Sequence, residues 1–145
     1  MRLSISSAIA GLVCFSTYVS AQPNKQLYEQ QERCGKRAAE VFKRKYSPPV
    51  AKIEHGQMTF RYENHYSSRL SKCFFLEIAN AYERIDGKPT ISKRMRLFDL
   101  NDNKEYGVFV GSICDGCGPM ACSVQDKVCQ SESEWQQLLK PLMED

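Results

Sequence analysis

The cysteines of this chain constrain its fold more than any other feature of the sequence. The chain has 145 residues and seven cysteines, of which Cys14 lies in an apolar segment near the N-terminus. An even number of cysteines in an exported chain indicates disulfides, because thiols outside the cytosol meet oxidising machinery. Six cysteines follow the apolar segment: Cys34, Cys73, Cys114, Cys117, Cys122 and Cys129.

The first 21 residues have the pattern of a secretory signal peptide. Arg2 precedes an apolar stretch over residues 5–15, and Val19-Ser20-Ala21 places small residues at the positions that signal peptidase reads. The apolar stretch is too short to span a bilayer, which takes about 20 residues. We expect cleavage between Ala21 and Gln22, and a mature protein in the periplasm or outside the cell.

Cys14 raises the alternative of a lipid anchor. A lipoprotein signal has a small residue just before its cysteine, and here that residue is Val13. We therefore expect no anchor. Because no later segment is long and apolar enough to cross a bilayer, we also expect no membrane span in the mature chain.

Size and charge limit the function further. Removal of residues 1–21 leaves 145 − 21 = 124 residues, 22–145, enough for a single domain with its own core. The chain has 20 Lys and Arg against 17 Asp and Glu, and the loss of Arg2 leaves 19 − 17 = +2. The longest basic run, Lys43-Arg44-Lys45, is interpreted as a solvated helix face, so we expect no nucleic-acid binding.

Two segments are predicted to be helices. Residues 24–46 place apolar side chains at spacings of three and four, and Pro48-Pro49 ends this helix. Ser131 and Glu134 have the spacing of a capping box at the start of a shorter, second helix, which Pro141 should kink or end. The predicted buried stripe of the second helix consists of Trp135, Leu138, Leu139 and Leu142.

The segment between the helices is predicted to hold antiparallel strands. After a linker that reaches Gly56, residues 58–62 alternate as a half-buried strand, and residues 63–68 are interpreted as a polar turn. Residues 70–83 form the strongest strand; a helix is the alternative, since Ala79-Asn80-Ala81 does not favour a strand. One predicted face of this strand carries Phe74, Leu76, Ile78 and Tyr82, and the other carries Cys73, Phe75, Glu77 and Ala79.

Further strands follow two turn signals. Asp86–Pro89 and Asn101–Lys104 have turn composition, and residues 93–100 and the segment from Tyr106 alternate as strands. The predicted fold is α+β: an N-terminal helix, an antiparallel meander of three to four strands and a short C-terminal helix, stapled by disulfides. Both helices are expected to cover one face of the sheet.

The positions of the cysteines narrow 15 conceivable pairings. Cys34 lies on the inward stripe of the first helix and Cys73 begins the central strand, so a helix lying on the sheet would join them. Cys122 and Cys129 flank a predicted small hairpin, and a bridge across its base is natural. A bridge between Cys114 and Cys117, or a swapped pairing among the four clustered cysteines, remains open.

The C-x-x-C pair at Cys114 and Cys117 is the one feature that could carry redox chemistry. Its surroundings, which include Gly116, Gly118 and Pro119, do not favour the helix that opens at the motif in thioredoxin-like proteins. A haem attachment site is excluded, because Gly118 stands where a histidine is needed.

Two segments resemble metal-binding motifs, but neither has the spacing or residue types that the motif requires. A four-thiolate zinc site formed by the four clustered cysteines would have a spacing of only four residues between its halves, against about 15–20 in zinc ribbons. Residues 99–103 begin like a calcium loop, but Lys104 and Val110 stand where glycine and a bidentate glutamate are required. We expect neither a metal nor another cofactor.

A polar and aromatic cluster is the remaining candidate site. It could line a binding surface or cap the end of the sheet. Neither His55 nor His65 has a Cys, Ser or acidic partner at a recognised catalytic spacing. The cluster consists of Tyr62, Asn64, His65 and Tyr66.

Four segments together carry a resemblance to known proteins. They are Arg33-Cys34-Gly35-Lys36-Arg37-Ala38, Tyr62-Glu63-Asn64-His65-Tyr66, Leu70-Ser71-Lys72-Cys73-Phe74 and Leu139-Lys140-Pro141-Leu142-Met143-Glu144. Through them the chain resembles a group of small exported proteins of uncharacterised function from Gram-negative bacteria. The resemblance implies an envelope or secreted location and transfers no activity.

The sequence thus predicts a non-enzymatic exported module that binds an unidentified protein or small molecule. The sequence contains no catalytic constellation that would indicate an enzyme. The alternative is a thiol–disulfide protein that uses Cys114 and Cys117.

Overall fold

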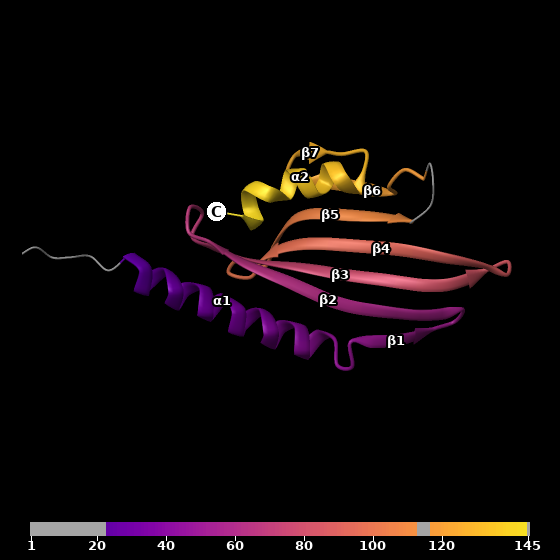
Figure 1. The fold of residues 1–145 in the computed structure, drawn as a ribbon, viewed down its shortest axis with the longest axis horizontal. Coiled ribbons are helices and arrows are strands. Elements are labelled where there is room, and N and C mark those ends of the chain that lie inside the picture. Colours follow the sequence, from indigo (N-terminus) through magenta and orange to yellow (C-terminus); the bar gives the residue numbers. More distant parts are fainter. Residues whose placement is uncertain (1–22, 113–116, 145) are drawn as a thin grey trace, which may run out of the picture.

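The computed structural model describes residues 23–112 and 117–144 (Figure 1). The predicted signal peptide, residues 1–21, and Cys114 lie outside the described residues. The elements in chain order are α1 (Pro23–Lys45), β1 (Val50–Ile53), β2 (Gly56–Ser67), β3 (Lys72–Ile85), β4 (Lys88–Asp99), β5 (Lys104–Ser112), β6 (Ala121–Val124), β7 (Lys127–Val128) and α2 (Glu132–Met143).

The sheet is an antiparallel meander in which each strand pairs with its neighbours in the chain. Its order is β1-β2-β3-β4-β5-β6-β7, so the α+β class is confirmed, whereas the predicted three to four strands are too few. Between β3 and β4, Asp86 and Gly87 have φ values of 50° and 77°, the left-handed backbone that a two-residue hairpin loop requires. At Gly56 a Cβ would lie 1.8 Å from the Tyr82 carbonyl oxygen, so this close approach of β2 to β3 requires glycine.

Two strand segments correct the sequence prediction. β1 occupies the predicted linker, and its burial pattern of three exposed residues and one half-buried residue leaves no alternation to recognise. β2 continues to Ser67 through the predicted turn at residues 63–68, because it pairs with β3 along its whole length. Glu63 and Asn64 stand at exposed positions of β2, where a strand tolerates polar side chains.

β3 is buried on both faces and divides the interior into two cores. Alternate residues of a strand point to opposite faces, so Phe74 belongs to one core and Phe75 to the other. The larger core contains Phe74, Leu76, Ile78, Met95, Leu97, Phe109, Cys122, Val124, Cys129, Trp135, Leu139 and Leu142. The smaller core contains Cys34, Ala38, Cys73, Phe75 and Leu100.

The two helices cover opposite faces of the sheet, which corrects the prediction that both cover one face. α1 contributes Cys34 and Ala38 to the smaller core, and α2 contributes Trp135 and Leu139 to the larger core. Because both faces of β3 are apolar, each face needs a cover of its own. Figure 1 shows α1 beside β2 and α2 beside β5 and β6.

α2 begins at the predicted N-cap, Ser131, and Glu134 reaches back to the residue before the N-cap instead of to the N-cap N–H of a standard capping box. The Ser131 hydroxyl accepts a hydrogen bond from the Glu134 N–H at 3.1 Å, and the Glu134 carboxylate accepts one from the Gln130 N–H at 2.8 Å. The helix runs past Pro141 to Met143. Pro141 cannot donate a hydrogen bond to the Gln137 carbonyl, but the turn after it still forms, since the Glu144 N–H donates to the Lys140 carbonyl at 2.9 Å.

Candidate functional site

The structure divides the predicted polar and aromatic cluster between two faces of the sheet. The Tyr62 ring packs against Phe42 and Phe75, with centroid distances of 4.7 Å and 5.4 Å. Tyr66 also packs against the smaller core, beneath α1. Strand alternation places His65 on the opposite face, so the cluster does not form one continuous surface.

The prediction of disulfide bonds is confirmed in the described residues. Cys34 and Cys73 are bonded, with a Cα–Cα distance of 5.4 Å, and join α1 to β3. Cys122 and Cys129 are bonded across the small hairpin, with a Cα–Cα distance of 5.1 Å, so they are not thiolates of a zinc site. Cys117 is exposed and disulfide-bonded.

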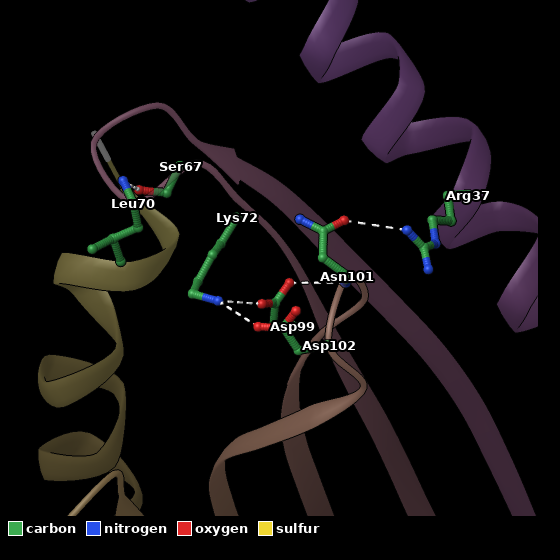
Figure 2. Close-up of polar contacts among 7 residues, drawn as sticks. All are labelled: Arg37, Ser67, Leu70, Lys72, Asp99, Asn101 and Asp102. Atoms are coloured by element: carbon green, nitrogen blue, oxygen red, sulfur yellow. Dashed lines mark hydrogen bonds and ion pairs between the residues drawn. The ribbon is translucent and has the colours of Figure 1, made fainter.

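A cluster of charges joins the β2–β3 turn to the β4–β5 turn (Figure 2). The Lys72 ammonium donates hydrogen bonds to Asp99 Oδ2 at 2.5 Å and to Asp102 Oδ2 at 3.0 Å. Asp99 is fully buried, and its other oxygen accepts a hydrogen bond from the Asn101 N–H at 3.0 Å. We call Lys72, Asp99, Asn101 and Asp102 the turn lock.

The turn lock has the chemistry of a structural clamp. Hydrogen bonds to Asp99 and then Asp102 raise the pKa of Lys72, so this amine stays protonated and cannot act as a general base. The hydrogen bond from Lys72 lowers the pKa of Asp102. Both carboxylates of the weak calcium-loop signal are therefore occupied by an ammonium. Across the described residues, no group of three or more His, Cys, Asp and Glu side chains could hold a metal ion.

A second ion pair lies between α1 and β3. Lys45 donates to the carboxylate of Glu77, which is buried beside Phe75 in the strand. Burial opposes the charge on Lys45, but hydrogen bonds to Glu77 and Tyr46 outweigh it and raise the pKa of the amine. The sequence signal was a glutamate within an apolar run, which predicts a partner but does not say which residue supplies it.

The most site-like feature is a cleft between α2 and the sheet, which we call the α2 groove. It has a volume of about 280 Å³. Its apolar lining comes from β3, β4 and α2, and its charged residues stand around that lining. The groove is lined by Arg61, Glu63, Leu76, Ile78, Lys93, Met95, Glu132, Trp135, Gln136, Leu139, Lys140, Met143 and Glu144.

Ion pairs order the charged rim of the α2 groove. Arg61 pairs with Glu63 at 3.0 Å on β2, and Lys93 of β4 pairs with Glu132 of α2 at 2.7 Å. Beneath them, Trp135 is fully buried and its indole N–H donates to the Ser123 carbonyl at 3.0 Å. The groove therefore combines a fixed apolar floor with a polar rim.

Comparison of the chain with protein-family models, with curated proteins and with solved structures finds no match. Within residues 23–112 and 117–144, neither helix has the length and apolar character needed to cross a membrane. Any proposal of function must therefore be based on the sequence and structure of this chain.

Proposed function

We propose that this protein is a non-enzymatic, disulfide-stabilised binding module of the bacterial periplasm or extracellular space, and that it binds a peptide segment of a partner protein in the α2 groove. The observation that carries the proposal is the apolar floor of the groove, which β3, β4 and α2 form within a charged rim. The pattern of residues 1–21 supports export.

The size of the α2 groove favours a side chain over a large cofactor. Small-molecule pockets usually measure about 300–1,000 Å³, and the groove, at about 280 Å³, lies just below that range. One or two apolar side chains of a partner would fill it. An apolar centre with a polar rim is the usual composition of a protein interface.

The charges of the rim disfavour a partner with a large net charge. Three cations line the groove, and so do three anions, so the rim has no excess of either charge. A polyanion such as nucleic acid would gain little from this balance. The rim residues are Arg61, Lys93 and Lys140 with Glu63, Glu132 and Glu144.

The buried acidic groups support a non-enzymatic function. Glu77 and Asp99 are the buried carboxylates of the described residues, and each is paired with a lysine. A general acid or base must be free to exchange its proton with a substrate. Neither carboxylate meets that requirement while its ion pair is intact.

Selection from a peptide library, followed by NMR mapping, tests the proposal. We expect selected peptides to shift the Trp135 indole and Met95 methyl signals. Gln136→Trp adds bulk to the exposed mouth of the groove and should weaken binding about tenfold or more, whereas Gln137→Trp, one position along α2 and outside the groove lining, should leave it unchanged. Peptides that bind elsewhere, or equal losses in both variants, would overturn the proposal.

A thiol–disulfide function of the Cys114/Cys117 pair is the second candidate. It is favoured by the exposure of Cys117, which is disulfide-bonded. The double variant C114S/C117S should fold normally and lose disulfide exchange with a model substrate. Absence of exchange in the wild-type protein would end this alternative.

A further inference from the structure

A polar pocket lies on the other side of the molecule, between α1 and the turn lock. Its volume is about 220 Å³, and it shares no lining residue with the α2 groove. α1, β2, the start of β3 and the two turns of the turn lock all contribute to it. It is lined by Gln30, Arg33, Cys34, Arg37, Tyr66, Ser71, Cys73 and Asn101.

The charge of this pocket is wholly positive. Arg33 and Arg37 stand one helical turn apart on α1, and no carboxylate lines the pocket. Like charges at this spacing repel and destabilise a helix slightly. Neither arginine forms an ion pair with an acid of the described residues, and Glu32, which lies next to Arg33 in the chain, is paired with Lys36 at 2.7 Å. An anion between the two guanidinium groups would remove their repulsion.

The turn lock holds one of these arginines in place. Figure 2 shows Arg37 reaching from α1 to Asn101, whose side-chain oxygen accepts a hydrogen bond from Arg37 Nη1 at 3.2 Å. The Asn101 N–H is in turn bonded to the buried Asp99. A guanidinium has five N–H donors, so most of those on Arg37 remain for a ligand. The Cys34–Cys73 disulfide fixes α1 against β3 within the same pocket.

The residues of the pocket that can donate hydrogen bonds come from several elements of the fold. Gln30, Tyr66 and Ser71 line it together with the two arginines, and each of these three residues has a side-chain group that can donate a hydrogen bond. A planar carboxylate is satisfied by one bidentate arginine, whereas a tetrahedral phosphate offers acceptor oxygens to donors on several sides. We propose that this pocket, the anion pocket, binds the phosphate group of a small molecule, with Arg33 and Arg37 as its charged contacts.

Calorimetric titration at constant ionic strength tests the anion pocket, with the disulfide-bonded protein and with inorganic phosphate, glycerol 3-phosphate and acetate as probes. We expect saturable binding of both phosphates and much weaker binding of acetate. Arg33→Gln and Arg37→Gln should each weaken phosphate binding about tenfold or more. Arg44→Gln, on the same helix but outside the pocket lining, should leave the dissociation constant unchanged.

Three outcomes would overturn the proposal: no saturable phosphate binding, an equal loss in Arg44→Gln, or acetate binding as tight as phosphate. Vesicles that contain phosphatidic acid distinguish a lipid headgroup from a soluble phosphate. Binding to vesicles alone, unaffected by Arg37→Gln, would also contradict a soluble phosphate ligand. Because the two sites share no residue, loss of this proposal would leave the α2 groove untouched.

Discussion

The two sides of the sheet are held together by different forces. Under α2, the larger core has twelve buried residues among those described, and under α1 the smaller core has five. The α1 side adds a disulfide, a stack of aromatic rings and the Lys45–Glu77 ion pair. On the other side the Lys93–Glu132 ion pair also joins α2 to β4, but α2 has no cysteine, and the Cys122–Cys129 bridge closes the small hairpin instead. The long α1, with few apolar residues, therefore depends more on specific links, and the short α2 depends more on apolar burial.

The largest expected effect tests the apolar side. Trp135→Ala removes the largest fully buried side chain and leaves the Ser123 carbonyl without its indole donor. We expect a loss of about 5 kcal/mol in the free energy of unfolding. Urea denaturation measures it, with Gln137→Ala on the exposed face of α2 as the control, expected to stay within about 0.5 kcal/mol of wild type. A loss below about 2 kcal/mol would contradict the claim that apolar burial in this core holds α2 on the sheet.

A comparison of the two disulfides sharpens the contrast. Cys34–Cys73 closes a sequence separation of 39 residues and Cys122–Cys129 one of 7. The chain-entropy relation gives about 4 kcal/mol for the first and about 2.5 kcal/mol for the second. We therefore expect C34S/C73S to lower the free energy of unfolding more than C122S/C129S, and Cys117→Ser to matter less than either.

Hydrogen exchange shows which helix each disulfide stabilises. In C34S/C73S the amides of α1 should lose protection while those of α2 keep it. Equal stability of the two double variants, or full protection of α1 without its disulfide, would show that packing alone holds this helix.

The smallest expected effect concerns the pH dependence of the turn lock. The pKa of Asp102 lies below its unfolded value of 3.8, so its stabilisation is complete above that pH and is lost as the pH falls through the folded pKa. The pKa of Lys72 lies above 10.5, so its own stabilisation is complete below that pH and is lost as the pH rises through the folded pKa.

Lys72→Met removes the ion pairs with Asp99 and Asp102, and with them this dependence of stability on pH. Thermal melts of wild type and variant should differ at neutral pH and converge as the pH falls well below 3.8. A difference in melting temperature that is constant down to about pH 2 would show that the ion pairs contribute nothing to it.

The fold could be predicted from the sequence where side chains alternate strongly. Phe74, Phe75, Leu76 and Ile78 predicted both the central strand and its two faces. The exposed edge strand β1 had no such pattern, and the polar stretch of β2 gains its structure from pairing with β3. The opposite placement of the helices depends on long-range packing that no local spacing contains.

The candidate sites were harder to predict, because their residues are far apart in the chain. The α2 groove joins Arg61, Met95 and Gln136, which come from three different elements. Arg33 and Arg37 are two of many polar residues of an amphipathic helix, and only the pocket that they line together with Asn101 distinguishes them. The local sequence did indicate that Glu77, which lies in an apolar run, needs a partner, and that two pairs of cysteines form disulfides.

The meander order has a consequence for how the chain assembles. Each strand pairs with the strand before it, so a chain that emerges with its N-terminus first can complete each hairpin as soon as the second strand is out. The bridges follow the same rule, since Cys73 is the next cysteine after Cys34 and Cys129 the next after Cys122. If Cys14 leaves with the predicted signal peptide, oxidation in order of appearance yields the Cys34–Cys73 and Cys122–Cys129 bonds without any exchange of partners.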